Sequence, residues 1–316
     1  MNVSGWILAL GQTALLILLA PLLSGWIKWV KCKFQNRRGP IPWQPYRDLA
    51  KLFRKEVVVA QQASPLFRAT PYLVFSVTVL ASSIVPAFAV GLPTAVIADV
   101  IVMVGFFALA RFFLCLAGMD LGTAFGGMGA SREVTISSLT EPAMLLAIFT
   151  LAMTFTSTNL DAMVLYTLTQ PFQIYPSFIF AGMSLLLVGV AECGRIPIDN
   201  PATHLELTMI HEAMILEYSG RHLALLEWAS MLKMLIFGVL ICNLFLPWGT
   251  ALHLEPTAIA IGLLTLGIKL MGLGFVLAAS ESVLAKMRLF RTPELLSLAF
   301  IIALLGMLGH VILEVH

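Results

Sequence analysis

Long apolar segments separated by shorter polar ones dominate the pattern of this chain. A helix needs about 20 mostly apolar residues to cross a bilayer. Most of the apolar segments are too evenly apolar for surface helices, so length is more informative than periodicity. Eight segments are long enough: 6–27, 71–92, 96–117, 139–159, 174–194, 222–247, 256–280 and 295–314. The pattern predicts an all-α, polytopic membrane protein with eight transmembrane helices in a single integral membrane domain, 1–316.

Composition supports this prediction and excludes other classes of protein. Hydrophobic residues make up 59% of the 316 positions and charged residues only 11%, whereas soluble domains are about a quarter charged. The net charge of +2 is too small to indicate a nucleic-acid partner. No basic residue precedes the first apolar segment, so it reads as a membrane span rather than a signal peptide.

Basic residues predict the orientation of the spans. Of the 19 lysines and arginines, 16 lie in the four loops that join spans one to two, three to four, five to six and seven to eight. The remaining three, Arg111, Lys233 and Lys269, fall inside spans. By the positive-inside rule, these four long loops are cytoplasmic and both termini lie on the outer side of the cell (inner) membrane.

The first of these loops predicts an amphipathic helix. Apolar side chains recur at helical spacing in this loop, and basic side chains occupy the other face. The apolar residues are Leu49, Leu52, Phe53 and Val57, and the basic residues are Arg47, Lys51, Arg54 and Lys55. This pattern suits a helix in the membrane interface, although a basic loop can also serve only to fix topology. The preceding turn, 37–40, with Trp43 and Pro45, is more specific than such an anchor requires.

Acidic residues gather in and beside two loops. Asp120, Glu133 and Glu141 flank the Gly-rich segment between spans three and four. Because an ionisable residue at membrane depth is costly, Glu141 either forms a structural ion pair with Arg111 or belongs to a proton path. The loop between spans five and six carries six carboxylates among apolar residues: Glu192, Asp199, Glu206, Glu212, Glu217 and Glu227. They form either a partly buried funnel, where desolvation raises the pKa values, or a solvated helix–loop–helix.

Two intramembrane lysines extend this pattern, and metal chemistry is not indicated. Lys233 and Lys269 suit a proton relay if buried, whereas snorkelling to the interface is the simpler interpretation. The four cysteines form no CxxC pair, and His204 and His211 are seven residues apart, too far to chelate one ion easily. We therefore expect no metal site and no cofactor in this chain, and no enzyme chemistry by the chain alone.

Several motifs resemble those of the subunit 1 family of respiratory complex I. These are the RRGP turn and the QPYRDLAKLFRKE run in the first loop, the interval between Arg132 and Glu141, ECGRIPID over 192–199, and EYSG over 217–220. Within that superfamily the sequence is most similar to energy-converting group 4 [NiFe] hydrogenases, the formate hydrogenlyase or hydrogenase-4 component C-like branch. The similarity lies in the run 110–133, which includes Asp120, and in Glu281 and Arg288. The chain departs from the family after Asp199, where two family carboxylates are replaced by Ala202 and His204.

The resemblance implies a coupling subunit of an oxidoreductase complex that docks a soluble redox arm. It implies a [NiFe] centre and iron–sulfur clusters in hydrogenase-like large and small subunits, with antiporter-like membrane subunits as further partners in the lipid bilayer. Relay residues would be Asp120, Glu141, Glu192, Asp199, Glu206, Glu212, Glu217, Glu227, Lys233, Lys269 and Glu281. Docking residues would be Arg37, Arg38, Gly39, Pro40, Trp43, Arg132, Arg195 and Tyr218.

Other functions are compatible with the same motifs. A quinone-site subunit of a complex I-like NADH dehydrogenase would have an open cavity between the first helix and the loops; quinone is the less favoured ligand. A purely structural anchor would only pair its charges with one another. A stand-alone transporter would move ions without partners.

Overall fold

A computed structural model describes residues 3–169, 175–199, 209–253, 255–285, 287 and 291–314. Within these ranges the regular secondary structure is helical, and two isolated β-bridges are the remaining pairings. The long helices are α1 (Val3–Phe34), α3 (Pro65–Ile84), α4 (Val100–Asp120), α5 (Ala124–Phe155), α7 (Pro176–Glu192), α9 (Gly220–Phe245), α10 (Pro256–Val283) and α11 (Thr292–Gly309). Shorter helices are α2 (Gln44–Arg54), η1 (Pro93–Ile97), α6 (Leu160–Thr169), α8 (His211–Ile215) and η3 (His310–Glu314).

The predicted membrane spans coincide with the long helices. Seven helices in the described part of the chain are long and apolar enough to cross a membrane, which confirms the all-α membrane class. The helix at the fifth predicted span, α7, is apolar but only 17 residues long and lies next to residues outside the described ranges. A count of eight spans therefore remains a prediction.

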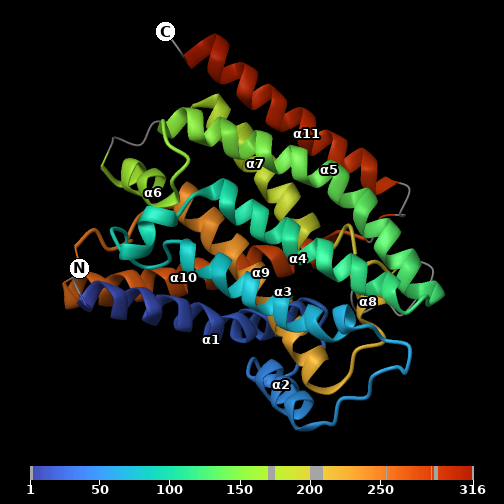
Figure 1. Cartoon of the computed structure of the whole chain (residues 1–316). Helices are drawn as coiled ribbons and strands as arrows, with labels where there is room; N and C mark the ends of the chain where they lie inside the picture. The colour runs from blue at the N-terminus through green and yellow to red at the C-terminus, as the bar shows by residue number, and fades with distance from the viewer. Residues whose placement is uncertain are drawn as a thin grey trace.

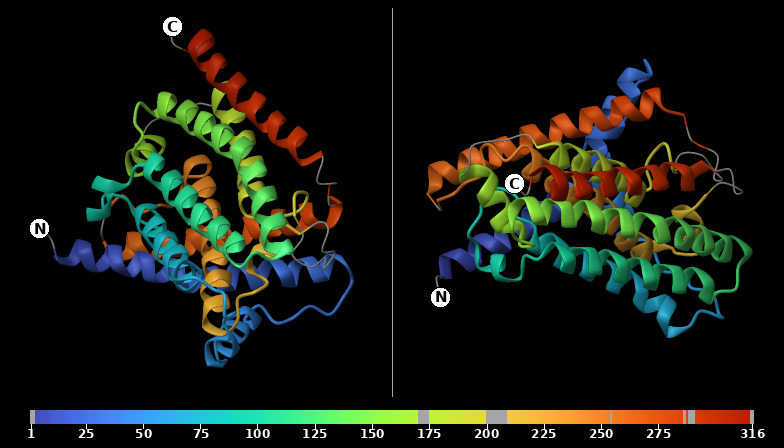
Figure 2. Two further views of the ribbon diagram at one scale, coloured as in Figure 1. Left: turned by 45° about the vertical axis from the view of Figure 1, so that its right-hand side comes forward. Right: turned by 90° about the horizontal axis from the view of Figure 1, so that it is seen from above.

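The long helices pack as one bundle with a shared apolar core (Figure 1). On one side α11 packs against α5 and α7, and on the other α1 packs against α9 and α10. Helices α3 and α4 pack against each other, and α3 also contacts α9. The views of Figures 1 and 2 place the start of α1 and the end of α11 at one end of the bundle, opposite α2 and α8. The basic loops thus share one end of the molecule.

Helix α2 lies in the first loop, where the sequence predicts an amphipathic helix. It begins with a proline in its first turn and buries Pro45 and Leu49, while Phe53 is 43% exposed. Val57 lies beyond its last residue, Arg54, so the helix is one turn shorter than the pattern suggests. Its position in a membrane interface remains a prediction.

Helix α5 begins earlier than predicted, because the Gly-rich segment is itself helical. Thr123 caps the helix by accepting a hydrogen bond from the Gly126 backbone N–H at 3.3 Å. The backbone of Gly126 lies so close to Gly118 of α4 that an added Cβ would stand 2.1 Å from the Gly118 carbonyl oxygen. Small residues of this kind let transmembrane helices approach closely.

Helix α3 ends at Ile84, before the end of its apolar segment. Residues 85–90 are buried without being helical, a state that membrane depth permits only where the protein satisfies the backbone. The Gln12 amide donates to the Val85 carbonyl at 3.1 Å, and the Asn243 amide donates to the carbonyls of Pro86 and Ala87 at 2.6 and 2.9 Å. These two side chains replace the missing helical hydrogen bonds.

Candidate functional site

A cavity of about 490 Å³ lies where the two most highly charged loops meet the bundle. It is lined by α1, α2, α3, α4, α5, α7, α8 and α9 and by the segment that follows α7. Its ionisable lining residues, apart from one cysteine, are Lys28, Asp48, Lys51, Lys55, Arg111, Glu133, Glu192, Arg195, Asp199, His211, Glu212, Glu227 and Lys233. Charge that is scarce elsewhere in the chain is therefore concentrated around one space.

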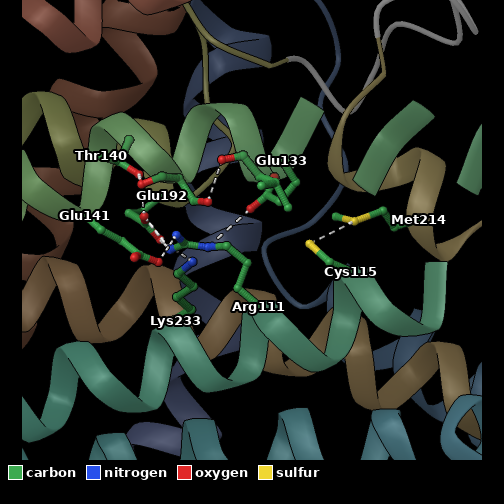
Figure 3. A network of polar contacts seen from close by, with 10 residues as sticks. Arg111, Cys115, Glu133, Thr140, Glu141, Glu192, Met214 and Lys233 are labelled. Carbon is green, nitrogen blue, oxygen red and sulfur yellow. Dashed lines mark hydrogen bonds and ion pairs between the residues drawn. The ribbon is translucent and has the colours of Figure 1, made fainter. Parts of the chain in front are cut away.

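Arg111 of α4 is the centre of an ion-pair network beside this cavity (Figure 3). Its Nη1 lies 2.7 Å from Oε1 of Glu141, and its Nη2 pairs with the carboxylate of Glu192. Its Nε lies 3.5 Å from Oε1 of Glu133. The sequence left open whether Glu141 pairs with Arg111, and the structure shows that pair.

Glu192, the last residue of α7, joins the network to α9. Its side chain is 2% exposed, and it accepts a hydrogen bond from Lys233 Nζ at 2.7 Å and from Thr140 Oγ1 at 3.1 Å. A buried carboxylate is stable in the ionised form only with such partners. We call Arg111, Glu133, Glu141, Glu192 and Lys233 the Arg111 cluster.

The Arg111 cluster contains two cations and three carboxylates, which leaves one negative charge without a partner when all five are ionised. Arg111 is 6% exposed, and its Nε has no hydrogen-bond partner among the described residues. A cluster with this imbalance can accept one proton and become neutral, and a buried group gains most from neutrality.

A second ion-pair group lies at the loop end of the bundle. Glu281 of α10, with a buried side chain, lies 2.8 Å from Lys31 Nζ and 3.3 Å from Arg195 Nη1. Arg195 Nη2 also contacts the Met234 sulfur at 2.9 Å. This group joins α1, α10 and the segment after α7.

The structure brings together most of the predicted relay residues that it describes. Glu192, Asp199, Glu212, Glu227 and Lys233 line the cavity. Glu141 reaches it through Arg111, and Glu281 through Arg195. Glu206 lies outside the described residues, as do Ala202, His204 and Arg288.

Three predicted relay residues lie away from the cavity lining. Asp120 accepts a hydrogen bond from the Ser64 backbone N–H at 3.0 Å and so joins α4 to the start of α3. Glu217 is exposed. Lys269 donates to Asn243 Oδ1 at 3.3 Å, and Asn243 is ten residues beyond Lys233 on α9.

The predicted docking residues divide into exposed and inward-facing side chains. Arg37, Arg38, Pro40 and Trp43 are exposed at the loop end, with Trp43 57% exposed. Gly39 lies against α1, where an added Cβ would stand 2.8 Å from Cys32 Cβ.

The other docking predictions concern side chains that hold the fold. Arg132 donates to the Met209 carbonyl at 2.8 Å, and Arg195 belongs to the Glu281 group. Tyr218 is buried, stacks on Phe67 with 4.0 Å between ring centroids, and donates to the Phe67 carbonyl at 3.0 Å. Burial raises the pKa of Tyr218 despite a hydrogen bond with Thr70, so its hydroxyl stays protonated as a donor.

Several site residues were not identified from the sequence. Glu133, Thr140 and the cavity-lining Asp48 were not among the predicted relay residues, and Arg111 was considered only as a partner of Glu141. A charged residue inside a span is itself an indication of function, and Arg111 met that criterion.

Within the described residues, no group of three or more His, Cys, Asp or Glu side chains is arranged to hold a metal ion. Cys115 lies 3.9 Å from the Met214 sulfur, inside the apolar cluster where α4 meets α8.

Comparisons with known proteins identify the family of the chain. The family model described as NADH dehydrogenase matches residues 7–312. Hydrogenase-4 component C of Escherichia coli (strain K12) is 35% identical over 304 residues, which cover 95% of this chain and 94% of that protein. Formate hydrogenlyase subunit 4 of the same organism is 31% identical and covers 90% of this chain and 92% of that protein.

More distant relatives extend the comparison. A subunit of the NADH-quinone oxidoreductase of Rickettsia bellii (strain RML369-C) is 28% identical over 67% of this chain and 64% of that protein. A chain in the structure of the membrane-bound sulfane sulfur reductase, an archaeal respiratory membrane complex, has the same fold, with a TM-score of 0.81 at 18% identity. The match covers 97% of this chain and 99% of that chain.

Proposed function

Because this chain belongs to the NADH dehydrogenase subunit 1 family, we propose that it couples a soluble redox arm to proton movement in a hydrogenase-like membrane complex. The relatives belong to hydrogenase-4, formate hydrogenlyase and complex I-like assemblies, so a membrane subunit of an energy-converting complex is the common role. The proposal goes further and assigns proton transfer to residues of this chain.

The observation that carries the proposal is the charged cavity. Ligand pockets are lined predominantly by hydrophobic side chains, whereas carboxylates and cations from several different helices converge here. Buried carboxylates with neighbours of both signs are suited to take up and release protons. In this proposal protons enter beside Glu212 and Glu227, reach Glu192, and leave through Glu141.

Partners complete the proposed function. A [NiFe] centre and iron–sulfur clusters would belong to the large and small subunits of the soluble arm. That arm would dock at the loop end, on the exposed side chains of Arg37, Arg38 and Trp43. Antiporter-like membrane subunits would receive protons from Glu141. The loop end would face the cytoplasm of a cell with this complex in its inner membrane, as the basic residues predict.

Glutamine variants of the intact complex test this function. We expect Glu141→Gln or Glu227→Gln to lower redox-driven proton uptake by inverted membrane vesicles at least about tenfold, because loss of one proton-transfer group typically costs about 100-fold or more. Glu255→Gln, at an exposed position before α10, is the matched control. If both test variants take up as many protons per electron as the native complex, the relay is contradicted.

A quinone site is the second candidate, because the cavity lies between α1 and the loops, as that function requires. Its volume of about 490 Å³ is within the range of small-molecule pockets. Quinone-dependent turnover by the purified complex, lost when the cavity-lining Ser230 is replaced by Trp, would establish this function instead.

A further inference from the structure

Arg111 separates two parts of the cluster that bears its name. Arg111, Glu133, Glu192 and Lys233 line the cavity, whereas Glu141 is not a lining residue. The Glu141 side chain is 37% exposed. A proton that travels from the cavity to Glu141 must therefore pass the Arg111 guanidinium, which contacts the carboxylates on both sides (Figure 3).

A guanidinium at this position opposes proton transfer. Arg stays charged in proteins and has no acceptor atom, so Arg111 cannot receive and pass on a proton. A fixed positive charge also repels an approaching proton, as arginines do in pores that exclude cations. The two carboxylates closest to Arg111 are therefore separated by the group least able to conduct between them.

One nitrogen of Arg111 is not yet paired, and this defines a second position for the guanidinium, closer to Glu133. Its Nη1 and Nη2 are paired, but the buried Nε has no hydrogen-bond partner in the described part of the chain and lies 3.5 Å from Glu133 Oε1. Buried donors are almost always satisfied. A shift of roughly half an ångström toward Glu133 would bring this pair to ordinary hydrogen-bond length. Because Glu133 and Glu141 lie eight residues apart on α5, about 12 Å along the helix, movement toward Glu133 also lengthens the contact with Glu141.

We infer that Arg111 is an electrostatic gate on the proton path, with a closed position on Glu141 and an open position on Glu133. The inference rests on the proposed function, because it requires that protons move through this cluster. A proton from cavity water that binds Glu192 cancels one of the charges that hold Arg111, so the guanidinium shifts toward Glu133. The proton then passes from Glu192 to Glu141 and Glu192 becomes ionised again; once Glu141 has released the proton, Arg111 returns to it.

The charged groups that face Arg111 come from three other helices. Glu133 and Glu141 approach it from α5, Glu192 from α7, and Lys233 lies behind Glu192 on α9. Protonation of Glu192 leaves Lys233 without its anion, so Lys233 repels Arg111 toward the two α5 carboxylates, and of these Glu133, at 3.5 Å, is the one not yet in close contact. Cys115, one turn along α4, is also buried.

Passive proton permeability of the whole complex in liposomes, without redox substrates, tests the gate. Arg111→Gln removes the barrier, and we expect permeability to rise about tenfold or more, equivalent to ~1.4 kcal/mol of barrier. Arg111→Lys keeps the charge and should stay as impermeable as the native complex. Thr135→Val, exposed on α5, controls for substitution itself. A merely structural role for Arg111 would lower assembly without a leak.

Glu133→Gln tests the open position separately. We expect native passive permeability and a large fall in redox-driven transport, because Arg111 can no longer leave Glu141. If Arg111→Gln fails to assemble, the other two variants still test the gate. A proton leak in Arg111→Lys would overturn it, and so would native redox-driven transport in Glu133→Gln. Glu141→Gln with native transport would instead reject the proposed function. If the Arg111→Gln complex stays impermeable to protons while Glu141→Gln impairs redox-driven transport, the gate is rejected and the proposed function stands.

Discussion

Lys31 and Glu281 lie 250 residues apart in the chain, and their side chains form an ion pair of 2.8 Å. Lys31 is in the last turn of α1, and Glu281 is near the end of α10. Arg195, which follows α7, shares the same carboxylate at 3.3 Å. One buried carboxylate therefore fixes three segments at the end of the molecule where the soluble arm is proposed to dock.

Glu281→Gln should destabilise the protein strongly. The substitution preserves shape but leaves Lys31 and Arg195 without their anion, and breaking a buried ion pair costs about 3–5 kcal/mol. We expect a lower apparent unfolding temperature and less assembled complex in membranes. Glu255→Gln, at the opposite end of the same helix, should be neutral. Equal stability of the two variants would show that the ion-pair group is not needed for folding.

Thr140→Val should weaken the hold on Glu192 without changing any charge. Thr140 is buried, and its hydroxyl lies 3.1 Å from Glu192 Oε1. Loss of a hydrogen bond to a charged group inside a membrane bundle costs about 1–2 kcal/mol. Reversible unfolding in mixed micelles compares the free energy of unfolding of this variant with that of Thr135→Val. The hydroxyl of Thr135 donates to the Ser131 carbonyl of its own helix. A Thr140→Val protein as stable as Thr135→Val would contradict the assignment.

Adjacent glycines of α5 should respond in opposite directions to alanine. A Cβ at Gly126 would stand 2.1 Å from the Gly118 carbonyl oxygen, so α4 and α5 must separate, at a cost of about 1–3 kcal/mol. A Cβ at Gly127 meets no atom within 4 Å, and alanine there should gain up to about 1 kcal/mol from helix propensity. The same unfolding measurement compares the two. Similar losses at both positions would mean that helix separation is not the cause.

The spans were predictable because length and apolar content are local properties. Their ends were less predictable, since tertiary contacts decide them. The sequence predicted a helix from 139, but packing of Gly118 against Gly126 lets α5 begin at Ala124. The sequence also predicted a span to 92, but α3 ends at Ile84, where Gln12 and Asn243 satisfy an unwound backbone.

The composition of the site was predictable, but not its geometry. Carboxylates in a charge-poor chain are conspicuous, so Glu141, Glu192 and Glu227 could be selected from the sequence alone. That Arg111 contacts three carboxylates depends on how α4, α5 and α7 pack, which periodicity does not determine. The partners of Glu281 come from segments far away in the sequence for the same reason.

The two intramembrane lysines should differ in their effect on transport. Lys233 pairs directly with Glu192, so Lys233→Met should lower redox-driven proton uptake about tenfold. Lys269 contacts Asn243, and ten helical residues place Asn243 roughly 15 Å along α9 from Lys233.

Buried apolar side chains, among them Ile236, Val239 and Leu240, occupy the part of α9 between Lys233 and Asn243. We therefore expect Lys269→Met to lower uptake less than Lys233→Met does, with a stability loss of about 1 kcal/mol because Oδ1 of Asn243 loses its donor. Vesicle uptake and unfolding, measured on the same preparations, separate the two effects. Native uptake in Lys269→Met would confine the relay to the cavity and the Arg111 cluster, whereas a loss as large as that of Lys233→Met would extend the proton path along α9 to the opposite end of the bundle.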